Sequence, residues 1–162
     1  MITEENKLSK SASRVQDFLK TKGLEFKVVE LSASTRTAND AANAIGCTVA
    51  QIVKSLIFCT KETKRPILVL ASGVNRVDEK LVSNHVGEKI EKADAAFALE
   101  VTGYAIGGIP PVAHKKQIIT FIDQDLLQYP ELWAAAGTPN AVFCLKSVNL
   151  QDLTLGKVVN IK

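Results

Sequence analysis

The sequence predicts a single α/β domain built on a mixed sheet of about six or seven strands flanked by helices. Helix and strand patterns alternate along all 162 residues without a long linker. Several connections between predicted strands are too short for the crossover that parallel neighbours need, which favours a mixed sheet. With 46% hydrophobic and 23% charged residues, a chain of this length buries one core and leaves little room for two.

Local signals place the elements of the first half of the chain. Ser9 or Ser11 caps a first helix, which ends at Gly23. Thr37 opens a short helix that Gly46 ends, with a capping-box pattern at its start. β-branched and apolar runs predict the strands of this half, which are Phe26 to Leu31, Ile52 to Cys59 and Ile67 to Ala71.

The second half follows the same alternation. Asp78 caps a helix that runs through His85, and Asp94 caps another that stops at Gly103. Two glycines and two prolines exclude regular structure from residues 104–116. The remaining predicted elements are strands at residues 88–91, 117–122, 132–136, 141–145 and 157–161, and one helical turn at residues 149–155.

Composition excludes several classes of protein. The longest apolar runs are far too short to span a bilayer. Residues 1–10 are polar, so we expect a lead-in without regular structure and no signal peptide. Three cysteines without CxxC spacing indicate reduced thiols in a cytoplasmic protein. A net charge of +3 is too small for a protein that coats nucleic acid, but a local basic patch could meet one phosphate-rich partner.

The sequence contains few recognisable catalytic motifs. The two histidines, His85 and His114, lie in no HExxH pattern, and the chain has no GxSxG, P-loop or strand-linked GxGxxG sequence. We interpret His85 as a helix C-terminal residue that favours the local dipole. For His114, beside the Gly/Pro loop, a structural and a functional role stay equally open. No metal or cofactor site is predicted.

Lys54 and the loop from Ile106 to Pro111 carry two interpretations each. Lys54 lies inside an apolar strand, where it either faces solvent or stands at the mouth of a pocket and binds a phosphate or a polarised carbonyl. Gly107 and Gly108 let the backbone approach a ligand and point N–H groups at an anion or oxyanion. The alternative for this loop is a rigid turn between two elements.

Two further segments are also ambiguous. The turn from Ala136 to Asn140 is either a plain strand connection or a second pocket wall that offers the Thr138 hydroxyl and the Asn140 amide. Lys115 and Lys116 are ordinary solvated charges, unless they border a pocket, where they would contact RNA phosphates.

Four segments in order resemble the YbaK/ProX family of editing domains, which are homologues of the insertion domain of bacterial prolyl-tRNA synthetase. The resemblance extends from about Ser11 to the C-terminus and implies the barrel-like sheet of that family in one domain spanning residues 1–162. It also implies hydrolysis in trans of the ester between a wrong amino acid and tRNA, without metal or cofactor. The segments are residues 51–56, 76–78, 102–111 and 136–140.

The resemblance also implies roles for individual residues. Lys54, Gly107 and Gly108 correspond to the catalytic positions: the lysine holds the terminal nucleotide, and loop N–H groups polarise the ester carbonyl. Lys54, Gly108 and Asn140 are therefore expected to converge on one cleft. The substrate-binding positions are Leu31, Thr37, Ser55, Ile109, Pro111, Gly137, Thr138 and Asn140, and Lys115 and Lys116 are expected to contact RNA.

The expected substrate is an aminoacyl-tRNA, with tRNA-Pro carrying alanine, serine, threonine or 2-aminobutyrate favoured. Members that remove cysteine carry an aromatic residue near Leu31, and members that remove alanine carry histidine where Asn140 stands. The alternatives are a Cys-tRNA-Pro deacylase, a hydrolase of a non-tRNA ester, and a non-catalytic module that binds tRNA or a synthetase. Prolyl-tRNA synthetase is an expected partner, whereas DNA and membranes are not.

Overall fold

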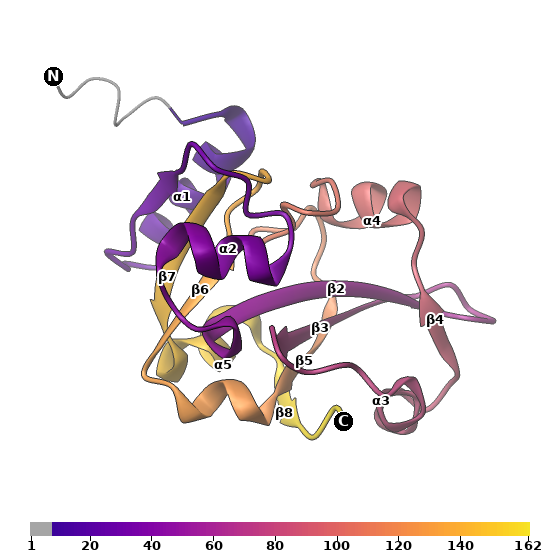
Figure 1. Cartoon of the computed structure of the whole chain (residues 1–162). Coiled ribbons are helices and arrows are strands. Elements are labelled where there is room, and N and C mark those ends of the chain that lie inside the picture. Colours follow the sequence, from indigo (N-terminus) through magenta and orange to yellow (C-terminus); the bar gives the residue numbers. More distant parts are fainter. Residues whose placement is uncertain (1–7) are drawn as a thin grey trace, which may run out of the picture.

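The computed structural model describes residues 8–162 (Figure 1). The predicted lead-in covers residues 1–10, and its first seven residues lie outside the described range. Its last part is corrected, because helix α1 (Lys10–Thr21) already begins at Lys10. Ser9 rather than Ser11 is the cap, since its hydroxyl accepts a hydrogen bond from the N–H of Ala12 at 3.1 Å.

Eight strands and five α-helices form one layered α/β domain within residues 8–162. The strands are β1 (Val28–Glu30), β2 (Ile52–Thr60), β3 (Pro66–Ser72), β4 (Ile90–Lys92), β5 (Ile119–Asp123), β6 (Glu131–Ala135), β7 (Ala141–Lys146) and β8 (Lys157–Val159). The helices after α1 are α2 (Ala38–Ile45), α3 (Glu79–Val86), α4 (Ala95–Thr102) and α5 (Ser147–Thr154), with 3-10 turns η2 (Val49–Gln51) and η3 (Gln124–Gln128).

All eight strands belong to one mixed sheet, which confirms the predicted fold class. The strand order is β1-β7-β6-β2-β3-β5-β8, and β4 pairs with the far end of β2. The pairs β2–β6, β3–β5 and β5–β8 are parallel, and the other four are antiparallel. Strands β6 and β7 cross β2 steeply, so the sheet is strongly curved (Figure 1).

The first predicted strand is shorter than expected. The pattern indicated Phe26 to Leu31, but β1 covers only Val28–Glu30. The side chain of Gln16 in α1 explains the difference: its Nε2 donates to the carbonyl of Phe26 at 3.0 Å, and its Oε1 accepts from the N–H of Val28 at 2.9 Å. A helix side chain thus replaces a strand partner at this end.

Two helical segments near the C-terminus extend beyond the prediction. The single turn predicted at residues 149–155 is the full helix α5. The turn η3 was not predicted; the Asp123 side chain caps it by accepting from the N–H of Asp125 at 2.9 Å.

The core lies on both faces of the sheet, and β3 is buried on both. Leu68 and Leu70 belong to the main cluster, together with apolar residues of α1, α4 and α5. Val69 and Ala71 belong to a second cluster with residues of α3. This explains why β3 has a continuous apolar sequence rather than an alternating one.

Among residues 8–162, no strand pairs with the middle of one edge of β2. Strand β6 pairs only with Ile52 and Val53, and β4 pairs only from Phe58 onward. The carbonyl of Ile57 accepts from the N–H of Ala93 at 3.1 Å on this edge. Because backbone groups alternate between the two edges of a strand, Ser55 presents its N–H and C=O to the same opening.

Candidate functional site

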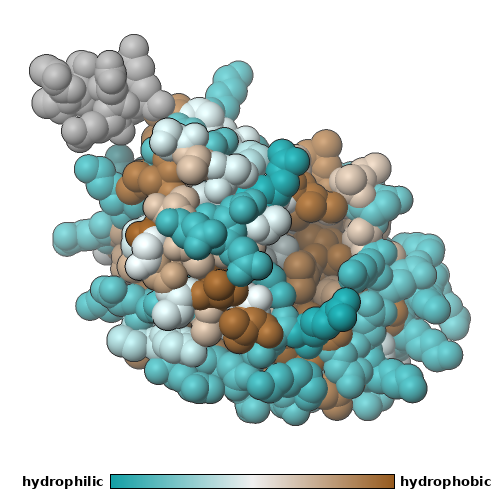
Figure 2. All heavy atoms as spheres, in the orientation of Figure 1, coloured by the Kyte–Doolittle hydropathy of each residue, from teal (hydrophilic) through white to brown (hydrophobic). Residues whose placement is uncertain are grey.

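A cleft with two adjoining compartments lies over this unpaired edge of β2. The compartments have volumes of about 310 and 770 Å³. Figure 2 shows the larger one as an apolar hollow with hydrophilic side chains around its rim. The residues that line both compartments are Lys54, Ser55, Leu56, Ile106, Gly107 and Ile109.

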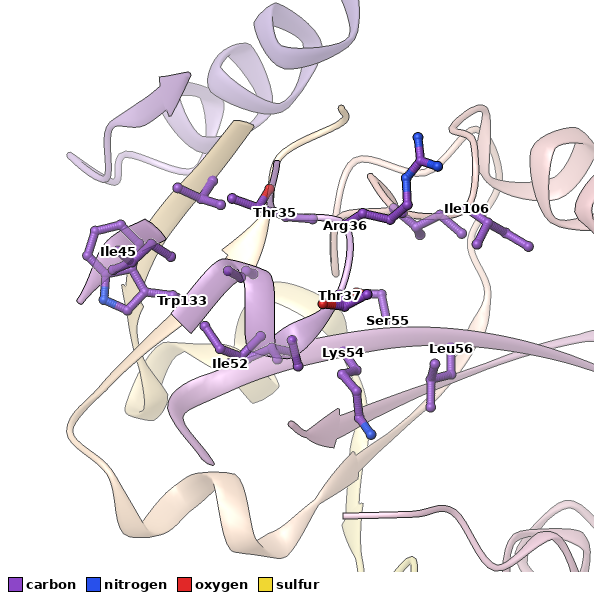
Figure 3. A pocket seen from close by; sticks show the side chains of 18 residues that line it. Thr35, Arg36, Thr37, Ile45, Ile52, Lys54, Ser55, Leu56, Ile106 and Trp133 are labelled. Carbon is purple, nitrogen blue, oxygen red and sulfur yellow. The ribbon is translucent and has the colours of Figure 1, made fainter. Parts of the chain in front are cut away.

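The smaller compartment lies between α2 and the sheet (Figure 3). Ala41 and Ile45 of α2 line it together with Ile52 and Trp133, and all four belong to one apolar cluster. Polar groups enter mainly from the segment just before α2, where Thr37 caps the helix by accepting from the N–H of Asp40 at 3.0 Å. The compartment therefore offers an apolar pocket with a polar mouth.

The loop with the two glycines borders both compartments at Gly107. This residue has φ +101°, and a Cβ there would lie 3.0 Å from Cγ of Arg36. The N–H of Gly107 forms no hydrogen bond with any residue from 8 to 162. The N–H of Gly108, by contrast, donates to the carbonyl of Ala105 at 3.1 Å, so of the two predicted donors only that of Gly107 is unoccupied.

Gly108 packs against the turn at residues 137–140 rather than facing the cleft. Its carbonyl accepts from the N–H of Gly137 at 2.8 Å. A Cβ on Gly108 would lie only 2.7 Å from Cα of Thr138. Asn140 in turn holds the segment before α2, because its Nδ2 donates to the carbonyl of Ala33 at 3.1 Å. The turn thus braces both segments that line the cleft.

The structure separates the residues of the sequence prediction into two groups. Thr37, Lys54, Ser55, Gly107 and Ile109 line the cleft. The predicted convergence of Lys54, Gly108 and Asn140 on one cleft is therefore met by Lys54 alone, with Gly108 and Asn140 behind its wall. The positions that do not line either compartment are Leu31, Gly108, Pro111, Gly137, Thr138 and Asn140.

The two lysines predicted to contact RNA also lie elsewhere. Lys116 borders a separate cavity of about 80 Å³ together with Pro111 and His114. Lys115 is exposed, and its backbone N–H donates to the carbonyl of Thr102 at 3.0 Å. Neither side chain lines the cleft, because the chain turns away from β2 after the prolines.

Lys54 lies half-buried where the compartments meet. Its Nζ donates to the backbone carbonyl of Asn75 at 2.6 Å. Burial lowers the pKa of Lys54, the negative charge of Asp123 raises it, and the positive charge of Arg76 lowers it further. Beside it, the buried hydroxyl oxygen of Ser55 has no hydrogen-bond partner among the residues that the structure describes.

The larger compartment has a basic wall that sequence reasoning missed. Arg76, Lys80 and Lys92 line it together with Lys54. Within residues 8–162, none of these four cations forms an ion pair with a carboxylate. They come from β2, the loop before α3, α3 itself and β4, so no local sequence signal connects them.

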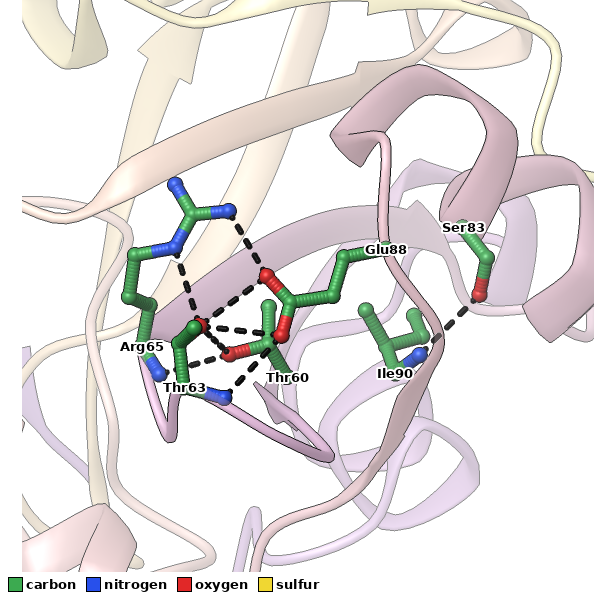
Figure 4. Close-up of polar contacts among 6 residues, drawn as sticks. All are labelled: Thr60, Thr63, Arg65, Ser83, Glu88 and Ile90. Atoms are coloured by element: carbon green, nitrogen blue, oxygen red, sulfur yellow. Dashed lines mark hydrogen bonds and ion pairs between the residues drawn. The ribbon is translucent and has the colours of Figure 1, made fainter.

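A polar network holds β4, which carries Lys92, against the end of β2 (Figure 4). The carboxylate of Glu88 accepts from the N–H of Thr63 at 3.0 Å and from a guanidinium nitrogen of Arg65 at 3.1 Å. These hydrogen bonds, led by the backbone one from Thr63, lower the pKa of Glu88. Arg65 therefore helps to fix one border of the cleft.

His114 lies behind the loop from Ile106 to Pro111 and holds it in place. Its Nε2 lies 2.7 Å from the carbonyl of Pro110, and the Tyr104 hydroxyl donates to the carbonyl of Ala113 at 2.9 Å. Burial lowers the pKa of His114. At neutral pH the ring is therefore uncharged, with its proton on Nε2 because a carbonyl can only accept.

This burial predicts an acid-dependent loss of stability. Below its ordinary pKa of 6.5, the histidine of the unfolded chain binds a proton that the folded chain resists. The stability is thus fully present above pH 6.5 and falls as the pH drops toward the lower pKa of the folded state. Urea unfolding across this range should show a smaller pH slope in His114→Gln than in the wild type. His85→Gln is the matched control, and equal slopes in all three proteins would contradict the role of His114.

Residues 8–162 contain no group of three or more His, Cys, Asp or Glu side chains placed to hold a metal ion. The three cysteines in this range form no disulfide, and only Cys59 is fully buried. None of the helices from α1 onward combines the length and apolarity needed to cross a bilayer.

Comparisons with known proteins show which family the chain belongs to. The family described as aminoacyl-tRNA editing domain matches residues 32–153. A solved structure named as a candidate trans-editing enzyme for prolyl tRNA synthetase is 48% identical, with a TM-score of 0.90 over 96% of this chain and 99% of that one. The uncharacterized protein YwhH of Bacillus subtilis is 31% identical over 136 residues, which span 83% of this chain and 85% of YwhH. EbsC of Enterococcus faecalis, named as a candidate Cys-tRNA(Pro)/Cys-tRNA(Cys) deacylase, is 26% identical over 77% of this chain and 76% of its own length.

The family match, together with these relatives, defines a hydrolase of the class that removes amino acids from tRNA. The chain belongs to the aminoacyl-tRNA editing-domain family. The resemblance, the fold and the enzyme class that the sequence predicted are thereby confirmed.

Proposed function

We propose that the protein deacylates tRNA-Pro that carries a small wrong amino acid and acts in trans after the synthetase has released it. The observation that carries this proposal is the meeting of a small apolar compartment and a larger basic one at Lys54, Ser55 and Gly107. An aminoacyl-tRNA has the same division, with a side chain on one side of the ester and a nucleotide on the other.

In this arrangement the amino acid enters the smaller compartment and the terminal adenosine enters the larger one. Apolar floor residues such as Leu56, Phe58 and Ala93 offer a surface for the base. Arg76 and Lys92 offer charges for the phosphates, since cations without carboxylate partners are available to an anionic ligand. The ester then lies over the unpaired edge of β2.

The chemistry is hydrolysis assisted by the substrate. Water attacks the carbonyl carbon, the bond to the ribose oxygen breaks, and that oxygen takes up a proton as the free amino acid leaves. The neighbouring ribose hydroxyl helps to activate the water, so the protein needs no general base. The N–H of Gly107 polarises the carbonyl, and one such donor contributes about 3 kcal/mol to transition-state stabilisation. Lys54 holds the nucleotide that presents the ester.

We favour alanine, serine, threonine or 2-aminobutyrate as the amino acid removed, as the family resemblance implies, and the apolar lining that includes Ile45 and Trp133 accepts such side chains. A Cys-tRNA-Pro deacylase is the second candidate, supported by the likeness to EbsC. Side chains of such similar size are separated by only about 1–3 kcal/mol in an apolar pocket, so several can be accepted.

The proposal places the protein in the cytoplasm, where charged tRNA is made, with aminoacyl-tRNA as its ligand and prolyl-tRNA synthetase as a partner. The likeness to a candidate trans-editing enzyme for that synthetase supports the partner.

The proposed function is tested by comparing Ala-tRNA-Pro with a short alanyl ester that lacks the tRNA. We expect fast release of alanine from the tRNA, in buffer with EDTA as well as without it, and little release from the short ester. Equal rates on both substrates would indicate a general ester hydrolase instead. Loss of activity in EDTA would contradict the metal-free reaction.

The basic wall predicts where RNA binds. Arg76→Ala combined with Lys92→Ala should raise the KM for aminoacyl-tRNA about tenfold and reduce the slope of log KM against log salt by roughly two charges. Lys115→Ala combined with Lys116→Ala removes the same charge outside the cleft and should leave both quantities unchanged. The opposite pattern would restore the sequence-derived assignment of RNA contacts to Lys115 and Lys116.

A further inference from the structure

A buried polar cluster lies behind Lys54, outside both compartments. Its centre is the carboxylate of Asp123 at the end of β5, which is 1% exposed. One oxygen of Asp123 accepts from the N–H of Ser72 at 3.0 Å and from Nδ2 of Asn75 at 2.8 Å. The other accepts from the N–H of Asp125 at 2.9 Å. Donors thus occupy both carboxylate oxygens, as a buried charge requires.

Asn75 connects this cluster to the cleft. Its backbone carbonyl is the acceptor for Nζ of Lys54 at 2.6 Å. Its side-chain amide also donates to the carboxylate of Asp125 at 2.8 Å, and Nζ of Lys162 lies 2.9 Å from the same oxygen. Its N–H donates to the carbonyl of Ser72 at 2.9 Å, which closes a tight turn after β3. Asn75 is therefore fixed on three sides while its carbonyl points at Lys54.

We propose that Asn75 and Asp123 are positioning residues that hold Lys54 in place for deacylation, an inference that rests on the proposed function. The buried carboxylate fixes the Asn75 amide, the amide fixes the turn, and the turn presents the carbonyl that directs the ammonium group. An ammonium group has three N–H donors. One is used by Asn75, and the other two are left for the substrate.

The same arrangement sets the charge around Lys54. Asp123 is the acidic group that raises the pKa of Lys54 against the effect of burial, whereas Arg76 lowers it. Replacing Asp123 by a neutral residue therefore lowers the pKa of Lys54 further. The other charged groups facing this space are Asp78, Glu79, Lys80 and Lys92 in the larger compartment and Asp125 and Lys162 behind the turn.

The first test uses no tRNA, so it is independent of the proposed function. Asp123→Asn keeps the shape of the side chain, and its amide oxygen can still accept from Ser72 and Asn75. Brief acetylation with an N-hydroxysuccinimide ester, followed by peptide mass spectrometry, reports the uncharged fraction of Lys54 across a pH series. We expect the midpoint of Lys54 labelling to move to lower pH, while Lys157, an exposed strand lysine, stays unchanged.

The direction in which the Lys54 midpoint moves distinguishes a lysine that stays in place from one that has become loose. A loosened Lys54 would return toward the ordinary lysine pKa of 10.5, so its midpoint would move to higher pH. A midpoint that moves upward, or does not move, would overturn the role of Asp123. Asn75→Ala, which keeps the backbone carbonyl but frees the turn, should move the midpoint upward by this reasoning; no movement would overturn the role of Asn75.

The second test is a double-mutant cycle on Ala-tRNA-Pro. Asn75→Ala should lower kcat/KM by about 10-fold to 100-fold, a typical cost of misplacing one group at a reacting centre. Asn84→Ala on the exposed side of α3 is the matched control and should have no effect. In a Lys54→Ala background, Asn75→Ala should cause no further loss, because it acts only through Lys54. The same fold-loss in both backgrounds would show a general structural role and overturn the proposal. If the wild-type protein shows no deacylation, the acetylation experiments on Lys54 alone decide whether Asn75 and Asp123 position this lysine.

Discussion

Lys54→Ala is expected to reduce deacylation of Ala-tRNA-Pro by about 100-fold or more in kcat/KM, the loss typical of removing a charged donor from a reacting site. Lys54 lies where the compartments meet, and its ammonium is directed by the carbonyl of Asn75. No other cation of the basic wall shares that hydrogen bond, so none can replace it. The measurement is a single-turnover deacylation time course with each protein.

The fold should survive this change. Lys54 is only half-buried, and the core clusters on either side of β2 do not include it. We therefore expect a Tm close to that of the wild type, with a change in unfolding free energy within about 1 kcal/mol. Lys157→Ala on β8 is the matched control for losing one strand lysine. Wild-type rates in Lys54→Ala would remove this residue from the site.

Gly108→Ala is expected to impair both activity and stability. A Cβ at this position would lie 2.7 to 2.8 Å from three backbone atoms of Thr138, and backbone cannot move aside as a flexible side chain can. The loop must shift away from the turn, which carries the neighbouring Gly107 out of place. We expect a loss of about 1–3 kcal/mol in stability from overpacking, and a loss of about 100-fold in kcat/KM from displacement at the reacting centre.

Gly23→Ala provides the control for Gly108→Ala. Gly23 ends α1 with φ +72°, and a Cβ there would have no neighbouring atom within 4 Å, so the change strains only the backbone. It should lower stability by about 1 kcal/mol and leave kcat/KM unchanged. Equal activity losses at both glycines would indicate that destabilisation alone, and not the position of the loop, controls the rate.

Local chemistry explains which parts of the fold were predictable. Three helix starts were predicted at the correct residue, and a fourth at one of two alternative serines, because an N-cap depends only on its own side chain and the next few N–H groups. These caps are Ser9, Thr37, Asp78 and Asp94. The shortened β1 was not predictable, because its first residues are paired by Gln16, which lies on a helix.

The site was predictable only where its residues are close in sequence. Lys54 and Gly107 carry local features, a charge inside an apolar strand and a paired glycine, that made a pocket one of two interpretations. The cations Arg76, Lys80 and Lys92 look like ordinary surface charges until β2, α3 and β4 bring them together. The turn at residues 137–140 was interpreted as a pocket wall, but it braces the wall from behind through Gly108 and Ala33.

The most direct test of the central claim is the deacylation of tRNA-Pro charged separately with alanine, serine, threonine, cysteine, 2-aminobutyrate and proline. We predict rapid release of alanine or another of the small non-cognate amino acids, with Pro-tRNA-Pro spared and with Lys54→Ala slower by about 100-fold or more on every substrate released. The substrate released fastest would identify the preference of the smaller compartment. Absence of release across the whole panel, or release of proline as fast as alanine, would contradict an editing function on tRNA-Pro.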